Sequence, residues 1–158
     1  MSLTIDRTAL GARLDDARER YGTPGASIAV LTSAGVSTAA SGILNRDTGV
    51  EATTDSLFQI GSITKVWTAT LVMQLVDEGL LDLDAPIRTY LPDFRVADEE
   101  TSRAVNARHL LTHTSGIDGD HFADTGRGDD VLERYVASCA SLGSVLPLAA
   151  TMSYCNTR

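Results

Sequence analysis

The stretch FQIGSITK at residues 58–65 determines how the rest of this 158-residue chain is interpreted. Sheet-forming patterns precede it, and helical patterns follow it. It leads into a helical pattern over residues 62–78, which Gly79 is placed to end. The apolar positions of this helix recur at helical spacing and are Val66, Ala69, Val72, Met73 and Val76.

Upstream of this stretch, the sequence predicts one helix followed by a β-hairpin. Residues 4–21 place apolar side chains at helical spacing with charges between them. The run ASIAVLT at 26–32 is rich in β-branched residues, and a turn at 33–35 leads into a second extended run at 36–42. Two strands alone are barely stable. The sequence therefore predicts the front portion of an α/β (α+β) fold, with an incomplete antiparallel sheet.

Downstream of residue 80, the sequence predicts helices and loops without strands. A Pro-containing connection covers 80–93, a short helix 105–112, a polar loop 118–128 and a further helix 129–142, whereas 145–158 has no clear pattern. We therefore expect helices flanking the sheet and, beyond it, a largely helical region.

Composition excludes several classes of partner. The formal charge of −8 comes from 21 acidic and 13 basic residues, which would repel nucleic-acid phosphates. No apolar run is long enough to span a membrane, and the first residues show no secretory signal, so we expect a cytoplasmic protein. The two cysteines, Cys139 and Cys155, form neither a disulfide framework nor a metal-ligand pattern.

One lysine carries the strongest chemical signal. Lys65 follows Ser62 by three residues, and every other basic residue is arginine. Side chains three residues apart share one side of a helix, so the hydroxyl and the amine can form a hydrogen bond. A serine in the first turn also lies at the positive end of the helix dipole, where its N–H can help to bind an oxyanion. The spacing alone leaves a second interpretation open, a serine N-cap followed by a surface lysine.

Four segments together resemble one enzyme family. Residues 58–65 resemble the S-x-x-K box of the serine β-lactamases and penicillin-binding DD-peptidases. The closest resemblance is to the branch with class C β-lactamases, DD-carboxypeptidases, D-aminopeptidases and related esterases. LLDLDAPIRTYLP at 80–92 and RHLLTHTSGI at 108–117 resemble two further segments of this branch, and SYCNT at 153–157 resembles its Y-x-N box.

The resemblance implies a fold, a reaction and four site residues. It implies the N-terminal portion of a β-lactamase-like domain over 1–158, with helix and hairpin in 1–60 and the helical region with both boxes in 61–158. It implies a serine hydrolase that acts on β-lactams, D-amino-acid peptides or small esters, without metal or organic cofactor. The implied catalytic residues are Ser62 as the nucleophile that becomes acylated, Lys65 as its proton acceptor or relay, Tyr154 as a partner in proton transfer, and Asn156 as the group that holds Lys65 and binds the substrate amide.

Two departures from the family pattern leave alternatives open. The third box, of Lys-Thr-Gly or His-x-Gly type, is absent from the sequence, and Leu148-Ala149 stands where Pro-Gly often precedes the Y-x-N box. The alternatives are a catalytically inactive fragment that retains binding, or one part of an enzyme completed by a second chain or a further C-terminal segment. A small acyl substrate is expected in every active form, with neither nucleic acid nor membrane as a partner.

The histidines form a weaker candidate site. His109 and His113 are four residues apart, a spacing that can bind zinc, and His121 lies in an aspartate-rich loop. No glutamate stands between the first two in the metalloprotease pattern. We therefore expect packing or capping roles and no metal site.

Overall fold

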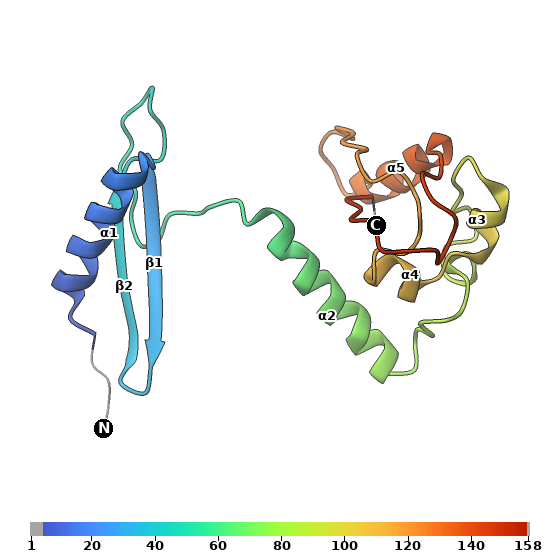
Figure 1. Cartoon of the computed structure of the whole chain (residues 1–158), viewed down its shortest axis with the longest axis horizontal. Helices are drawn as coiled ribbons and strands as arrows, with labels where there is room; N and C mark the ends of the chain where they lie inside the picture. The colour runs from blue at the N-terminus through green and yellow to red at the C-terminus, as the bar shows by residue number, and fades with distance from the viewer. Residues whose placement is uncertain (1–4, 158) are drawn as a thin grey trace. The chain divides into compact units, whose positions relative to one another are not determined.

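The computed structural model describes residues 5–157 (Figure 1). The chain divides after Ile60 into two compact units. We call them the hairpin unit, up to residue 60, and the helical unit, from residue 61 onward, and describe each by itself.

The hairpin unit contains one helix and two strands. Helix α1 (Arg7–Tyr21) begins after Asp6, whose carboxylate accepts a hydrogen bond from the N–H of Thr8 at 2.8 Å, and it ends at Gly22 with a φ of 64°. Strand β1 (Gly25–Thr32) pairs antiparallel with β2 (Gly35–Gly42). The predicted hairpin is therefore present, and these two strands make up the only sheet among residues 5–157.

Helix α1 packs mainly against β2, as Figure 1 shows. Arg18 Nε donates a hydrogen bond to Ser41 Oγ at 2.8 Å, and the Ser41 hydroxyl donates to the carboxylate of Asp15. Gly42 leaves room for the arginine, because a Cβ at this position would lie 2.7 Å from Arg18 Cδ. Polar contacts of Arg18 and Asp15, and the close packing of the Arg18 side chain on Gly42, thus hold the helix on the hairpin.

The helical unit begins with the segment that contains Ser62 and Lys65. A 3-10 turn, η1 (Gly61–Ile63), leads into α2 (Thr64–Asp77), and Gly79 follows with a φ of 71°. The prediction of an α-helix from Ser62 was therefore wrong by two residues, because the first turn is wound more tightly.

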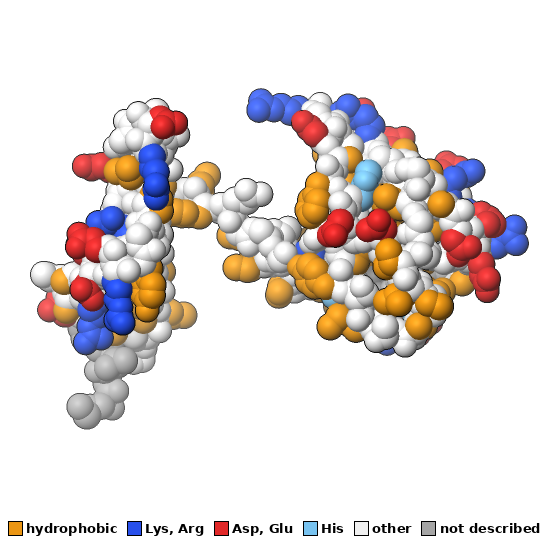
Figure 2. All heavy atoms as spheres, turned by 45° about the horizontal axis from the view of Figure 1, so that its top comes forward, with side chains coloured by type: hydrophobic (Ala, Val, Ile, Leu, Met, Phe, Trp, Pro, Cys, Tyr) orange, Lys and Arg blue, Asp and Glu red, His pale blue; other side chains and the backbone are white. Residues whose placement is uncertain are grey.

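One stripe of α2 is half-buried, at Lys65, Ala69, Val72 and Val76. Val66 and Met73, predicted to share the apolar face, are 67% and 40% exposed. Both lie one position beyond the stripe, so the helical period turns them away from it. Hydrophobic side chains are visible on the surface in Figure 2. Large exposed apolar residues of α2 are Val66, Trp67, Leu71, Met73 and Leu75.

The rest of the helical unit consists of short helices and long connections. Its elements are η2 (Ile87–Thr89), α3 (Glu99–Ala104), α4 (Ala107–Leu111), α5 (Val131–Ser138) and η3 (Cys139–Ser141). The predicted helices at 105–112 and 129–142 correspond to α4 and to α5 with η3. Helix α3 was not predicted, although Asp98 caps it and two glutamates occupy its first turn. Within the described chain, no helix has the length and apolar character needed to cross a membrane.

The core of the helical unit lies among these short elements. Its buried members are Ile87, Val96, Val105, Ala107, Ile117 and Cys139. Backbone hydrogen bonds across long sequence separations reinforce it, such as Ile87 N–H to Val105 O and Ala97 N–H to Leu142 O, both 2.9 Å. A small core thus fixes connections that have little secondary structure of their own.

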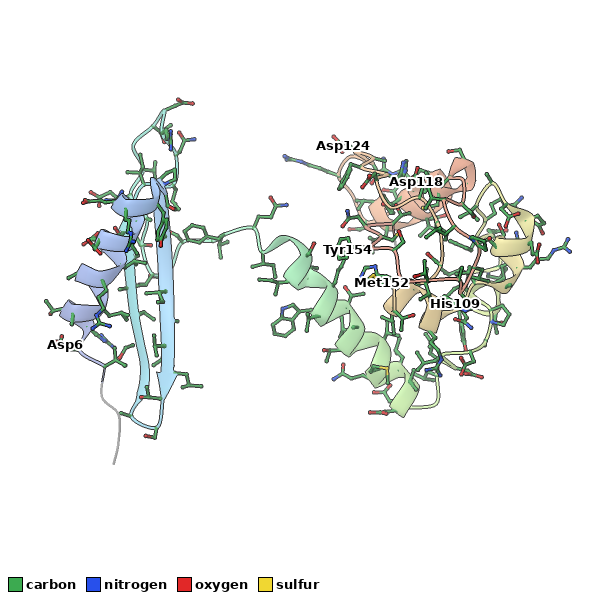
Figure 3. All side chains as sticks on the ribbon, in the orientation of Figure 1. Asp6, His109, Asp118, Asp124, Met152 and Tyr154 are labelled. Atoms are coloured by element: carbon green, nitrogen blue, oxygen red, sulfur yellow. The ribbon has the colours of Figure 1, made fainter. Side chains whose placement is uncertain are left out.

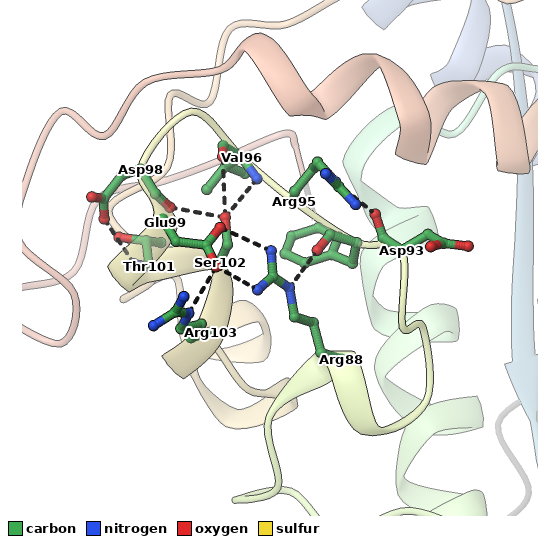
Figure 4. A network of polar contacts seen from close by, with 10 residues as sticks. Arg88, Asp93, Arg95, Val96, Asp98, Glu99, Thr101, Ser102 and Arg103 are labelled. Carbon is green, nitrogen blue, oxygen red and sulfur yellow. Dashed lines mark hydrogen bonds and ion pairs between the residues drawn. The ribbon is translucent and has the colours of Figure 1, made fainter.

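A polar network fastens α3 to the preceding loop (Figure 4). Arg88 donates to both carboxylate oxygens of Glu99 at 2.8 and 3.1 Å, and Arg103 donates to the same group at 2.7 Å. Hydrogen bonds from Arg88 and Arg103 lower the pKa of Glu99 from 4.5 to about 2. Buried Ser102 accepts from the N–H of Val96 at 2.9 Å, which ties the loop to the helix.

We expect acid to weaken the helical unit through this network. The folded-state pKa of Glu99 lies below its ordinary value of 4.5, so its contribution to stability is present above that pH and is lost as pH falls from 4.5 towards about 2. Urea unfolding across this range should show Glu99→Gln less stable than the wild type at neutral pH and converging with it at the acid end. Glu100→Gln, at a neighbouring position outside the observed ion pairs of residues 5–157, is the control. A constant difference between wild type and Glu99→Gln would contradict the assignment.

Ala149 has a φ of 61°, a conformation that suits glycine. A left-handed alanine costs about 1–2 kcal/mol, and glycine's greater unfolded-state entropy offsets about 0.5–1 kcal/mol of the gain. Ala149→Gly should therefore raise the free energy of unfolding by about 0.5–1 kcal/mol. Ala150→Gly, where no positive φ occurs, should lower it instead. Denaturant unfolding of both variants checks the prediction, and equal effects would refute it.

Candidate active site

The helical unit brings the four predicted site residues together. Ser62 lies in the 3-10 turn and Lys65 in the first turn of α2, whereas Tyr154 and Asn156 lie in the irregular C-terminal segment. Figure 3 shows Tyr154 beside the start of α2. Contacts over more than 90 positions of sequence therefore build the cluster.

The Ser62 hydroxyl accepts hydrogen bonds from two donors. The Tyr154 hydroxyl donates to Ser62 Oγ at 2.7 Å, and Lys65 Nζ donates to the same oxygen at 3.3 Å. Lys65 Nζ also donates to Asn156 Oδ1 at 2.9 Å. Both donors would stabilise negative charge on Oγ, and whichever group lost its proton could accept the proton of Ser62.

The environment of the cluster is partly open to solvent. Ser62 is exposed and Tyr154 is 53% exposed, while Lys65 is half-buried. Lys65 Nζ lies 5.0 Å from the centroid of the Tyr154 ring, within the range of a cation–π interaction. Ser62 lies just before the N-terminus of α2, which is the positive end of the helix dipole. A molecule in solvent can therefore reach the serine, while Asn156 holds the half-buried lysine through a hydrogen bond.

His113 contacts three consecutive residues of the Y-x-N box. Its carbonyl oxygen accepts from the N–H of Ser153 at 2.8 Å, and its Nδ1 accepts from the N–H of Cys155 at 3.0 Å. Its ring stacks on the Tyr154 ring, with centroids 4.5 Å apart and planes inclined by 27°. The segment after α4 thus supports the box through backbone, side chain and ring.

Gly119 supports the box from a second position. Its carbonyl oxygen accepts from the N–H of Asn156 at 3.1 Å. A Cβ on Gly119 would lie 2.8 Å from Cys155 Cα and 3.0 Å from the carbonyl oxygen of Tyr154, too close for an unshifted backbone. Only glycine allows the two segments to approach this closely without movement.

A pocket of about 330 Å³ lies next to the cluster. Lys65 and Asn156 line it, together with apolar side chains of α2, α4 and the connection between them. The pocket is mostly apolar apart from these two residues and two threonines of α2. A mostly apolar pocket with a few polar groups of this kind is typical of small-molecule binding sites.

The histidines have structural partners, as expected. His109 Nδ1 accepts from the N–H of Asn106 at 3.3 Å in a capping box at the start of α4. His121 Nε2 lies 2.8 Å from Ser138 Oγ. Figure 3 shows His109 apart from Asp118 and Asp124. Among residues 5–157, no group of three or more His, Cys, Asp or Glu side chains is arranged to hold a metal ion.

His113 and Gly119 are site features that the sequence patterns did not identify. Both lie in or just after the segment RHLLTHTSGI, for whose histidines the sequence predicts only packing or capping roles. The only available signal was a histidine and a glycine within a family-like segment, and neither indicates contact with a tyrosine more than 30 positions away.

Comparisons with known proteins identify the family of the chain. A family model described as Beta-lactamase matches residues 10–158. Penicillin-binding protein 4 of Amycolatopsis lactamdurans is 52% identical over 98% of this chain and 41% of its own length, and esterase EstB of Burkholderia gladioli is 36% identical over 73% of this chain and 31% of its own. The crystal structure of D-amino acid amidase from Ochrobactrum anthropi SV3, complexed with L-phenylalanine, superimposes with a TM-score of 0.67 at 28% identity, over 95% of this chain and 43% of that one. The chain thus spans less than half the length of these relatives.

The close approach at Gly119 predicts that adding a single methyl group at this position destabilises the fold. Gly119→Ala should lower the free energy of unfolding by about 1–3 kcal/mol, because the box backbone must move away from the new Cβ. Gly143→Ala is a matched control, since a Cβ there meets nothing within 4 Å. Denaturant unfolding of both variants tests the prediction, and an equal loss in both would show that the approach at Gly119 is not tight.

Proposed function

Because this chain belongs to the Beta-lactamase family, we propose that it provides the nucleophile and proton-transfer groups of a serine hydrolase, with Ser62 as the residue that becomes acylated. The observation that carries the proposal is the convergence of Lys65 Nζ and the Tyr154 hydroxyl on Ser62 Oγ. In the simpler alternative, a serine N-cap with a surface lysine, neither a distant tyrosine nor a distant asparagine would be expected at these atoms.

The family and fold that the four motifs indicated are confirmed. The matched region includes all four motif segments. The structure has helices and a two-stranded antiparallel sheet, and the similarity to the amidase structure covers nearly the whole chain. The relatives include a penicillin-binding protein, an esterase and a D-amino acid amidase, and this range supports the proposal of a hydrolase.

In the proposed acylation step, Ser62 Oγ attacks the carbonyl carbon of an amide or ester. The O–H bond of Ser62 breaks as the new C–O bond forms, and the proton passes to Lys65 or Tyr154, whichever is deprotonated at that moment. The same pair then returns a proton to the departing amine or alkoxide. A water molecule repeats the sequence on the acyl-enzyme, which releases the acid and restores the Ser62 hydroxyl.

Asn156 has a proposed role in both positioning and binding. Its Oδ1 accepts from Lys65 Nζ and so holds the amine between Ser62 and the C-terminal segment. Its amide nitrogen is a donor suited to a carbonyl oxygen of the substrate. The backbone N–H of Ser62, in the first turn before α2, supplies one donor for the oxyanion.

We propose acyl substrates with a small amide or ester group, namely β-lactams, D-amino-acid peptides or small esters. The three relatives act as a guide to this range, because one is named for penicillin binding, one as an esterase and one as a D-amino acid amidase. Exposure of Ser62 and Tyr154 allows such a group to approach from solvent.

A second candidate function is binding or acylation without efficient turnover. The exposure of Ser62 and Tyr154 favours it, because hydrogen bonds to a developing oxyanion are weaker in water than in an enclosed site. In that case the chain would form a long-lived acyl-enzyme, or would bind the substrate without reacting.

Intact-mass spectrometry of the purified chain is the direct test. After exposure to a β-lactam and, separately, to an activated ester, we expect one acyl adduct per chain, because Ser62 is the hydroxyl that receives both donors. Ser62→Ala should abolish the adduct, and Tyr154→Phe should slow its formation about 10²-fold or more, as expected for loss of a general acid–base group. Release of the adduct over time distinguishes turnover from a stalled acyl-enzyme.

Ser141→Ala is the matched control, because Ser141 is an exposed serine in η3 outside the cluster. It should acylate like the wild type. An adduct that persists in Ser62→Ala would move the nucleophile elsewhere. A folded wild-type chain that gives no adduct with either reagent would reject catalysis by this chain and leave binding as its function.

A further inference from the structure

His113 has a backbone conformation that is uncommon for residues other than glycine. Its φ is 59°, in the left-handed region that non-glycine residues rarely adopt. Such residues persist where surrounding contacts hold them, and they often occur at functional sites. Contacts to the Y-x-N box hold His113, in addition to the hydrogen bond from its N–H to the Leu110 carbonyl oxygen at 3.2 Å.

These contacts surround the side chain whose placement matters most for the proposed chemistry. The residue before Tyr154 donates its N–H to the His113 carbonyl oxygen, and the residue after it donates its N–H to His113 Nδ1. The imidazole ring then lies against the Tyr154 ring at 4.5 Å. One residue therefore constrains the backbone on both sides of Tyr154 and the orientation of its ring.

We propose that His113 is a positioning residue for Tyr154, and that ring stacking keeps the phenol oxygen in line with Ser62 Oγ. This inference rests on the proposed function, in which Tyr154 transfers a proton at Ser62. Tyr154 is 53% exposed, so the protein interior does not enclose its ring. The stacked imidazole supplies a fixed surface where solvent would otherwise allow the ring to turn away from the 2.7 Å contact.

The hydrogen bond from Cys155 also defines the tautomer of the His113 ring that stacks on Tyr154. Because Nδ1 accepts the N–H of Cys155, the neutral ring carries its proton on Nε2. Asparagine can reproduce this acceptor with its Oδ1 and tolerates a positive φ, but it has no ring. Phenylalanine keeps a ring for stacking but has no acceptor. The two substitutions therefore separate the ring contact from the backbone contact.

A second histidine offers a matched control. His109 Nδ1 also accepts a backbone N–H, that of Asn106, but its role is to cap α4. His109→Asn is the same chemical change at a residue with the same kind of hydrogen bond. A purely structural role for His113 predicts that His113→Asn and His109→Asn affect the chain alike.

The experiment compares these variants in the full chain by two measurements. The first is the NMR signal of the Tyr154 ring in protein labelled with ¹³C-tyrosine, assigned through Tyr154→Phe among the four tyrosines. The second is the rate of adduct formation with an activated ester, measured by intact mass. Circular dichroism and thermal unfolding establish that each variant is folded.

We expect His113→Asn to shift the Tyr154 ring signal and to slow acylation about 10- to 100-fold, the scale of a misplaced catalytic group. His113→Phe should recover part of that rate, with a ring signal nearer to the wild type. His109→Asn should leave the acylation rate within about twofold of the wild-type rate. It should leave the position of the Tyr154 ring signal unchanged within error, whatever it does to stability.

Folded His113→Asn that acylates within twofold of the wild type would overturn the proposal, as would an unshifted Tyr154 signal. If the wild-type chain forms no adduct, the proposed function fails separately, and the ring signal alone then decides whether His113 positions Tyr154. Should His113→Phe fail to fold, His113→Asn and His109→Asn still decide the outcome.

Discussion

The hydrogen bond from Lys65 Nζ to Asn156 Oδ1 is the contact on which the arrangement of the helical unit's site depends. It joins the first turn of α2 to a segment 91 positions later, at 2.9 Å. The C-terminal segment has no regular secondary structure, so its position comes from such contacts and from hydrogen bonds to residues 113–119. The lysine therefore connects α2 to the C-terminal segment, and in the proposed reaction the same group would also move a proton.

Local patterns in the sequence predicted the elements whose contacts are local. The hairpin and α2 followed from β-branched runs, helical periodicity and terminal glycines. The meeting of Ser62 and Lys65 followed from their spacing, because neighbouring turns of one helix determine it. Tyr154 and Asn156 were placed only by family resemblance, since no periodic pattern links residues so far apart.

The failures of prediction have particular physical causes. Helix α3 is six residues long, too short for a periodic pattern to stand out, and its cap at Asp98 was the available signal. Val66 and Met73 are apolar without being covered in the described chain, so hydrophobicity alone misassigned the buried stripe of α2. The support from His113 depends on a left-handed backbone at a non-glycine residue, which composition and periodicity do not reveal.

The 3-10 turn at Ser62 has a consequence for how this region can evolve. Ser62 lies in this turn and Lys65 lies in the first turn of α2, and the spacing of three residues places the serine and the lysine on the same side of the helical segment. One inserted or deleted residue would rotate the lysine by about 100° around the helix axis. Replacement of the two intervening side chains, Ile63 and Thr64, leaves that phase intact. The segment can therefore drift in composition but not in length.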